Sequence, residues 1–379
     1  MKITDVKCYL VNPRKPLVKV EADNGTFGWG EAGPSAWHRT FMFEAAVRHF
    51  RAFLIGQDPR RLGALWEQMY RGGAMEGGRI IAAATSAVDV ALHDLVARSL
   101  DVPVYQLLGG KQRDFIPCFA PIGDGDVPNW VAQGWQALRL SMAFSKDKGI
   151  WEPRESIGLA VPRMIAVRES VGPGPALGVD YHHAFSVAEA ASFCQQLPPG
   201  TLDFIEDPIR EATPGAYAAL RRMTEIPFAV GEVFTSKWEW LPYIEQDLIN
   251  LARIDIGNVG GLTESMKVAG WCEAHYVDMM PHLAISPLST AAIIHFLAAI
   301  PNVAWMEDRN RNSDASFRPR DPEMYPRQPT PQGAQYPVTD VPGLGVEINE
   351  AAIAEASAKE HLDFGETKRQ QRRDGSKLY

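Results

Sequence analysis

The stretch Leu202-Asp203-Phe204-Ile205-Glu206 is a short apolar run that ends in a carboxylate, and the same pattern occurs on either side of it. Ala-Leu-Gly-Val-Asp ends at Asp180 and Phe-Ala-Val-Gly-Glu ends at Glu232, each 26 residues from Glu206. A strand, a turn, a helix and a return loop of a (β/α) barrel need about this many residues. The spacing therefore predicts an α/β fold with a TIM-like barrel.

The rhythm continues through polar residues at the ends of three later runs. Asp255, His282 and Glu307 follow Glu232 at steps of 23, 27 and 25 residues. Active sites of such barrels lie at the C-terminal ends of the strands. A closed barrel needs eight strands, and the sequence has eight strand-like runs. The strand-like runs are residues 114–121, 137–143, 176–182, 202–208, 227–232, 248–255, 276–282 and 303–308.

Acidic side chains at one position in successive repeats converge on one point. Asp180, Glu206 and Glu232 would repel one another there unless a cation neutralised them. Carboxylate oxygens are the ligands that hard divalent cations prefer. We therefore expect these three residues to bind one divalent metal ion.

The first hundred residues follow a different pattern. Residues 17–22 and 26–31 alternate as strands do and flank Asp23-Asn24-Gly25, which is a strong hairpin signal. A long helix is expected next, with a buried face formed by Ile81, Ala84, Val88, Leu92 and Leu95. A sheet followed by helices predicts a separate α+β domain over residues 1–112, with Gly109-Gly110 as the hinge.

The end of the chain departs from the barrel rhythm again. Residues 308–330 are rich in Pro, Arg and Asp and have no clear periodicity. We expect the barrel domain to span residues 113–335. The segment 336–379 is expected to pack back on the N-terminal domain.

Composition limits the classes of function. The 379 residues carry a net charge of −8, which argues against nucleic acid or an anionic membrane as the main partner. The four cysteines form no CxxC pair, so neither a zinc site nor a disulfide framework is indicated. The N-terminus has no apolar signal-peptide region, and a cytoplasmic protein with reduced cysteines is expected.

His182 follows Asp180 by two residues. In a strand these two side chains point to the same side, and Tyr181 points to the other. If Asp180 faces a metal ion, His182 faces the same cavity, where it is well placed for acid–base chemistry. The alternative is a structural histidine, which the shared phase with Asp180 disfavours.

Asp255 and His282 end consecutive strands, which are neighbours in a barrel. A carboxylate that holds one ring nitrogen of an imidazole makes the other nitrogen a general base. The alternative is that each residue caps the following helix. Asp207 has the opposite strand phase to Glu206 and is expected to be structural or to support the metal ligands without binding the metal itself. No spacing argument favours His183.

Several motifs together resemble the mandelate racemase subgroup of the enolase superfamily. They are Gly28-Trp29-Gly30-Glu31, Ala91-Leu92-His93-Asp94, Leu107-Leu108-Gly109-Gly110 and Pro342-Gly343-Leu344-Gly345. The resemblance implies a (β/α)7β barrel with an N-terminal α+β capping domain that the C-terminal segment completes. It also implies Mg²⁺ as the cofactor, and abstraction of a proton next to a carboxylate.

The resemblance also assigns roles to particular residues. Asp180, Glu206 and Glu232 match the Mg²⁺ ligands, and Asp255 with His282 matches the Asp-His base. Glu307 matches the group that hydrogen-bonds the substrate carboxylate in its enediolate form. Asp-x-His at the third strand most resembles galactonate dehydratase and related sugar-acid dehydratases, in which the histidine helps the 3-hydroxyl leave.

The second strand departs from the pattern of many members, which have Lys-x-Lys there. Arg139 and Ser141 stand in those positions. Arginine is effectively always protonated, so it is not a base, and we expect Arg139 to bind substrate. Lys146 or Lys148 in the next loop are the remaining candidates for a second base. Mannonate dehydratases similarly lack the lysine pair.

One clear base, His282, and one acid, His182, are what a dehydratase needs. The favoured activity is therefore a Mg²⁺-dependent hydro-lyase that converts a sugar acid (galactonate, gluconate or mannonate-like) into a 2-keto-3-deoxy acid. The alternatives are a racemase or epimerase of a 2-hydroxy acid and a catalytically retired binding protein. We expect a homo-oligomer whose partner is a small sugar acid, with specificity from loops near Trp37-His38 and Arg71-Gly72-Gly73.

Overall fold

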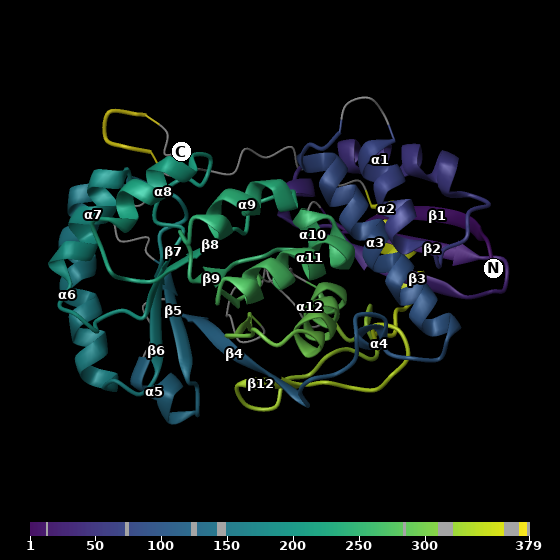
Figure 1. Ribbon diagram of the computed structural model, residues 1–379. Coiled ribbons are helices and arrows are strands. Elements are labelled where there is room, and N and C mark those ends of the chain that lie inside the picture. Colours follow the sequence, from purple (N-terminus) through teal and green to yellow (C-terminus); the bar gives the residue numbers. More distant parts are fainter. Residues whose placement is uncertain are drawn as a thin grey trace.

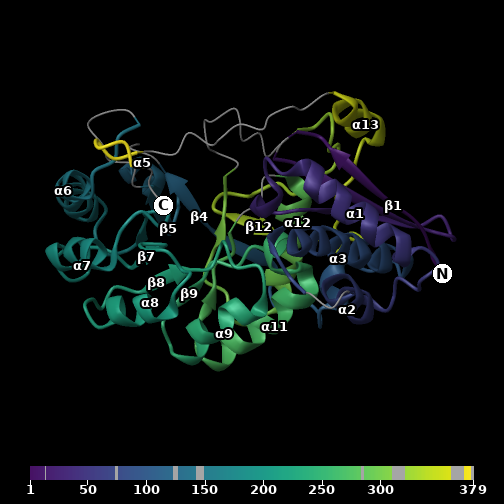
Figure 2. The same cartoon turned by 90° about the horizontal axis from the view of Figure 1, so that it is seen from above.

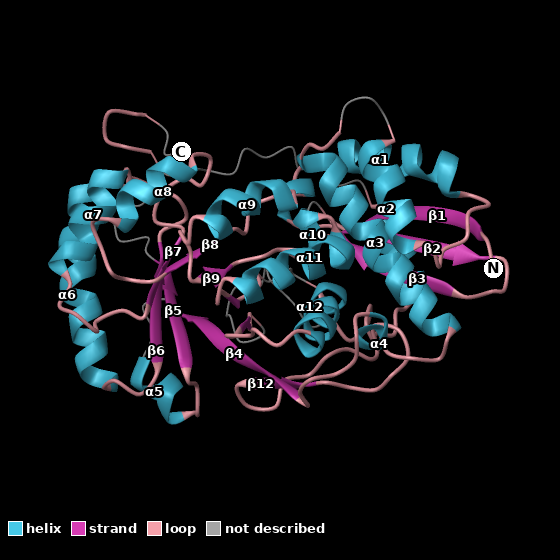
Figure 3. Ribbon diagram, in the orientation of Figure 1, coloured by secondary structure: helices cyan, strands magenta, loops and turns pink. Residues whose placement is uncertain are grey.

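The computed structural model describes residues 1–12, 14–72, 76–122, 127–141, 149–282, 286–309, 321–359 and 371–376. Two sheets organise these residues, an antiparallel N-terminal sheet and a mainly parallel one (Figures 1 and 3). Helices ring the parallel sheet, and a separate set of helices covers the N-terminal sheet. The α/β fold with a TIM-like barrel is as expected.

The N-terminal sheet is antiparallel and has the order of the sequence: β1 (Ile3–Leu10), β2 (Pro16–Ala22) and β3 (Phe27–Glu31). The hairpin predicted around Asp23-Asn24-Gly25 joins β2 to β3. Gly28 and Gly30 let β3 lie directly against a helix, because a Cβ atom there would stand 2.1 Å and 2.0 Å from backbone oxygens of that helix. Helices α1 (Thr40–Leu54) and α3 (Arg79–Ser99) pack on this sheet, and α2 (Leu62–Arg71) packs against α3.

Helix α3 connects the two sheets. It is the long helix expected around Val88, and its carboxylate Asp89 accepts hydrogen bonds from the backbone and the hydroxyl of Thr263 in the barrel domain. By length and composition α3 could cross a membrane, but 89% of its most apolar 18-residue window is buried inside the protein. This burial is typical of a core helix.

The parallel sheet supplies the barrel strands. Their order is β10-β9-β8-β7-β6-β5-β4-β11, and an isolated parallel bridge between Met279 and Val303 links β10 to the segment just before β11. Each strand lies at one of the eight predicted runs, although most are shorter than predicted. The strands are β4 (Phe115–Ile122), β5 (Ala137–Ser141), β6 (Ala176–Asp180), β7 (Phe204–Glu206), β8 (Phe228–Val230), β9 (Leu251–Ala252), β10 (Asp278–Met279) and β11 (Met306–Glu307).

Helices follow the strands and lie outside them (Figure 3). Inside the barrel, Phe119, Phe204 and Met280 belong to a small, fully buried apolar cluster. Gly178 makes room for it, because a Cβ atom there would lie 2.1 Å from the ring of Phe204. The helices of this region are α5 (Val127–Ala132), α6 (Pro153–Val171), α7 (Val187–Gln196), α8 (Pro214–Arg221), α9 (Lys237–Glu245), α10 (Ile256–Val259), α11 (Gly261–Ala274) and α12 (Pro287–Ala299).

The C-terminal segment returns to the N-terminal domain. After β12 (Gln335–Pro337) has paired antiparallel with β4, the backbone N–H of Leu344 donates to Asp94 of α3 at 2.7 Å. Helix α13 (Glu350–Ala358) then lies beside β1, where the Ser357 hydroxyl accepts from the backbone of Leu10 (Figure 2). Short α4 (Val104–Leu107) and the 3-10 turn η1 (Pro34–Ala36) complete the elements. The domain boundaries at 112/113 and 335/336 remain predictions.

Candidate active site

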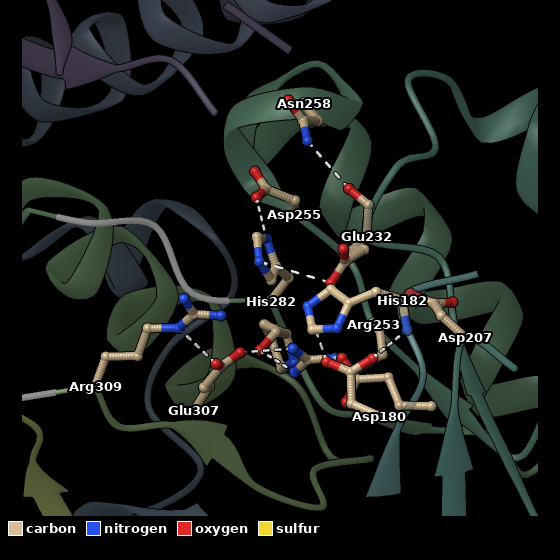
Figure 4. Close-up of polar contacts among 12 residues, drawn as sticks. Asp180, His182, Asp207, Glu232, Arg253, Asp255, Asn258, His282, Glu307 and Arg309 are labelled. Atoms are coloured by element: carbon tan, nitrogen blue, oxygen red, sulfur yellow. Dashed lines mark hydrogen bonds and ion pairs between the residues drawn. The ribbon is translucent and has the colours of Figure 1, made fainter. Parts of the chain in front are cut away.

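The carboxylates singled out in the sequence lie at the C-terminal ends of barrel strands. Asp180 and Glu206 are the last residues of β6 and β7 and are paired in register, while Glu307 is the last residue of β11. Glu232 and Asp255 follow β8 and β9 after short turns. The strands thus bring these side chains to one end of the barrel (Figure 4).

The predicted metal ligands fit a cation in their chemistry. Asp180 is 1% exposed and Glu206 is not exposed at all. Among the described residues, neither Oδ2 of Asp180 nor Oε2 of Glu206 accepts a well-aligned hydrogen bond, although Nε2 of His182 lies 3.1 Å from the former. Buried carboxylate oxygens without a donor are costly unless a cation or proton satisfies them. These oxygens are therefore suitable ligand atoms for Mg²⁺.

Two buried arginines neutralise negative charge in this cluster of carboxylates. Arg139 Nη1 lies 2.7 Å from Oε1 of Glu206, and Arg253 Nε lies 2.9 Å from the same oxygen. Both guanidinium groups also reach Glu307, Arg139 at 3.3 Å and Arg253 at 2.5 Å. The four side chains therefore form a closed ring of opposite charges inside the barrel.

The ring sets the ionisation of its members. Burial disfavours the charged forms, but Arg309, Arg139 and Arg253 outweigh it and hold the pKa of Glu307 well below its usual range. For Arg139, the nearby carboxylates likewise outweigh burial and raise its pKa. In this arrangement Glu307 accepts hydrogen bonds as an anion. Its hydrogen bond to a substrate carboxylate remains a prediction and needs a proton on one of the two groups, because two carboxylate anions have no donor between them.

Arg139 is 1% exposed, and it forms ion pairs with carboxylates of the chain itself. It therefore positions Glu206 and Glu307 in this structure, and binding of substrate by Arg139 remains a prediction. Ser141, at the end of β5, is exposed. Lys146, Lys148 and Gly73 lie outside the described residues.

Asp255 and His282 are within hydrogen-bond distance. Nδ1 of His282 lies 2.7 Å from Oδ2 of Asp255, and Nε2 lies 3.6 Å from Oε2 of Glu232. Burial lowers the pKa of His282, but Glu232 and Asp255 outweigh it, so the pKa is raised. A carboxylate on Nδ1 leaves Nε2 facing the cluster, which is the orientation that a general base requires.

The N-terminal domain supports this part of the site. Asn258 donates from Nδ2 to the backbone oxygen of Glu232 at 3.0 Å, and its Oδ1 accepts from the backbone of Ser35. Gly33 lies so close to the dyad that a Cβ atom there would be 2.6 Å from Oδ1 of Asp255. The loop after β3 thus fixes two strand ends of the barrel.

His182 shares the site, as Figure 4 shows. Its Nε2 lies 3.1 Å from Oδ2 of Asp180, and its side chain is 57% exposed, so a ligand can reach it. The geometry arises from a turn, because His182 lies beyond β6 and has a φ of 46°. Tyr181 points away and packs on Phe185 and Phe193.

Sequence reasoning set aside two residues that the structure places at the site. His183 Nδ1 lies 3.0 Å from Glu211, and its Nε2 lies 3.7 Å from Oδ2 of Asp207. Asp207 is 1% exposed. The sequence signal that could have indicated the His183–Asp207 pair is the presence of two polar residues in a row, His182-His183 and Glu206-Asp207, at the ends of consecutive strands. Arg253 was also missed.

Family models cover most of the chain. Residues 12–109 match the N-terminal domain of the mandelate racemase / muconate lactonizing enzyme family, and residues 127–352 match the enolase C-terminal domain-like family. The chain belongs to the enolase superfamily. The resemblance seen in the sequence motifs is thereby confirmed.

Curated members of the superfamily align with nearly the whole chain. The D-galactonate dehydratase of Ralstonia nicotianae is 34% identical over 368 residues, which are 94% of each chain. The D-galactonate dehydratase of Ralstonia pickettii is also 34% identical, over 96% of each chain.

Solved structures of the superfamily are also similar. An enolase from Pantoea ananatis with bound D-gluconate and Mg has a TM-score of 0.88 at 26% identity and covers 100% of this chain and 99% of its own. An enolase from Agrobacterium radiobacter, a putative galactarate dehydratase with bound Na and L-malate, has a TM-score of 0.87 at 26% identity, with 100% of both chains covered.

Proposed function

We propose that this enolase-superfamily protein is a Mg²⁺-dependent dehydratase of a sugar acid, which it converts into a 2-keto-3-deoxy acid. The observation that carries the proposal is that two histidines, His182 and His282, face one cluster of carboxylates from different strand ends. The named relatives, two D-galactonate dehydratases, and the gluconate-bound neighbour support the same class of substrate.

His282 is the proposed base for the proton next to the substrate carboxylate. Asp255 holds Nδ1 at 2.7 Å and thereby directs Nε2 toward the cluster. The raised pKa of His282, to which Glu232 and Asp255 contribute, strengthens it as a proton acceptor. General bases placed in this way typically contribute about 10²–10⁴-fold to the rate.

His182 is the proposed acid for the leaving 3-hydroxyl. It lies 3.1 Å from Asp180 and is more exposed than His282, which suits a group that must reach a distal part of the substrate. A hydroxide ion is a poor leaving group, so elimination needs a proton donor at that oxygen.

Asp180, Glu206 and Glu232 are the proposed metal ligands, and the unsatisfied buried oxygens of Asp180 and Glu206 support that assignment. Mg²⁺ bound there would stabilise negative charge that develops on the substrate carboxylate. The ion pairs with Arg139 and Arg253 hold Glu206 in place.

Incubation of the full-length protein with Mg²⁺ and a panel of aldonic and aldaric acids tests the proposal. We expect at least one acid to yield a 2-keto-3-deoxy product, detected by NMR. A change of configuration at C2 with no keto acid would replace the proposal with a racemase or epimerase. A protein that binds a member of the panel and turns over none would be a retired enzyme.

A further inference from the structure

A second group of possible metal ligands adjoins the proposed Mg²⁺ site. Ligand atoms of His183, Asp207 and Glu232 all lie within 4.8 Å of one another. The three residues follow β6, β7 and β8, so neighbouring strands supply them. Only Glu232 is shared with the Mg²⁺ site proposed above.

The carboxylate of Asp207 is buried and lacks hydrogen-bond donors among the described residues. It is 1% exposed, and neither of its carboxylate oxygens accepts a hydrogen bond from any residue that the structure describes. A buried carboxylate without hydrogen-bond donors is strongly destabilising unless a positive charge compensates it. The imidazole of His183 could supply that charge, but its Nε2 lies 3.7 Å from Oδ2 of Asp207, which is too far for a hydrogen bond.

The 3.7 Å between Nε2 of His183 and Oδ2 of Asp207 suits two ligands of one metal ion better than a hydrogen bond. With bonds of roughly 2.1 Å, adjacent ligand atoms of a tetrahedral or octahedral ion lie about 3.0–3.4 Å apart, so a shift of a few tenths of an ångström would suffice. The backbone already holds the pair together, because the N–H of His183 donates to the carbonyl oxygen of Asp207 at 2.6 Å.

The other ring nitrogen of His183 is also arranged as in a metal ligand. Nδ1 lies 3.0 Å from Oε2 of Glu211, while Nε2 is the nitrogen nearer to Asp207. Histidines that bind metals usually donate their second N–H to a carboxylate, which fixes the tautomer and the ring orientation. Glu211 would do this for His183 after a small rotation of the ring, because Nδ1 is 3.0 Å away but not aligned for a hydrogen bond.

We propose that His183, Asp207 and Glu232 form a second divalent-cation site, which prefers a borderline ion such as Zn²⁺ or Ni²⁺ and takes Mn²⁺ more weakly. The nitrogen donor gives the preference, because imidazole suits borderline ions, whereas Mg²⁺ and Mn²⁺ favour oxygen ligands; Mn²⁺ serves below as a paramagnetic probe of the site. The inference rests on the proposed function only in sharing Glu232 with it.

Pulsed electron paramagnetic resonance of Mn²⁺ added to the metal-free, full-length protein tests the site. Nitrogen coupling from a directly bound imidazole is expected in the wild type and is expected to vanish in His183→Gln. Coupling should persist in Glu206→Gln, which disables only the all-oxygen set. His182→Gln and His282→Asn are matched controls at the other nearby histidines and should also keep the coupling.

Metal affinity provides a second readout. Glu211→Gln should keep the nitrogen coupling and weaken Mn²⁺ binding by about 10–100-fold, the usual effect of losing such a supporting carboxylate. Absence of nitrogen coupling in both the wild type and Glu206→Gln would overturn the proposal. So would coupling that disappears in His182→Gln or His282→Asn. Formation of keto acid with Mg²⁺ is scored separately, so failure of the dehydratase proposal and failure of this site are distinguishable.

Discussion

Arg253 binds Glu307 with 2.5 Å between Nη2 and Oε2, and neither side chain is exposed to solvent. This pair closes the ring of charges beneath the proposed metal ligands, since Nε of Arg253 also reaches Glu206. Water cannot screen such a pair, so each member depends on the other for its charged state.

Replacement of Arg253 should therefore destabilise the barrel. Arg253→Met leaves Glu206 and Glu307 buried with one cation fewer, and loss of one partner of a buried pair typically costs about 3–5 kcal/mol. A lower thermal midpoint in scanning calorimetry is the expected result. Arg60→Met is the matched control, because the ion pair of Arg60 with Asp58 is exposed, and it should leave the midpoint unchanged. An Arg253→Met protein as stable as the wild type would refute a compensating role for the ring.

The dyad makes a prediction about proton exchange. His282→Asn should stop exchange of the substrate α-proton with D₂O, because the proposed acceptor is gone. Asp255→Asn should slow exchange, because Nδ1 of His282 loses the carboxylate that now lies 2.7 Å away. Deuterium incorporation followed by NMR measures both. Exchange at the wild-type rate in His282→Asn would assign the base to another group.

His295 makes a prediction about stability and pH. Burial lowers the pKa of His295 to about 4, and its Nδ1 accepts a hydrogen bond from the backbone of Tyr105. The unfolded chain takes up this proton near pH 6.5, whereas the folded protein does so only near pH 4. Stability should therefore fall as the pH drops from about 6.5 to 4, by roughly 3 kcal/mol from this residue.

A histidine variant isolates that contribution. In His295→Asn the thermal midpoint should depend less steeply on pH between about 6.5 and 4 than in the wild type. His49→Asn removes an exposed histidine and should follow the wild-type curve. Parallel curves for wild type and His295→Asn would contradict the prediction.

The sequence predicted the strand ends well, because a barrel repeats one unit and places its active site on one face. Asp180 and Glu206, found by a spacing of 26 residues, are paired in register in the structure. Residue roles were harder to predict. Arg139 was predicted to bind substrate at a position where many family members have a lysine, and only the fold reveals its ion pairs with Glu206 and Glu307. Arg253 lies two residues before Asp255, so strand alternation could have drawn attention to it.

His183 and Asp207 were missed because they lie where alternation no longer applies. Asp207 was placed on the opposite side to Glu206 by a period of two, but it lies beyond the end of β7 with a φ of 38°. His183 likewise has a φ of 63°. Left-handed backbone at a non-glycine residue redirects the side chain, and it is often found at functional sites. No periodicity in the sequence signals such a turn.

The central claim is that His282 and His182 carry out two separable steps of a dehydration. The most direct measurement is α-proton exchange and keto-acid formation in one D₂O incubation of His182→Asn, with a sugar acid that the wild type dehydrates. We predict that deuterium uptake at C2 continues, because His282 is intact, while keto-acid formation falls by about 10²–10⁴-fold. Dehydration at the wild-type rate, or equal loss of both signals, would contradict the account.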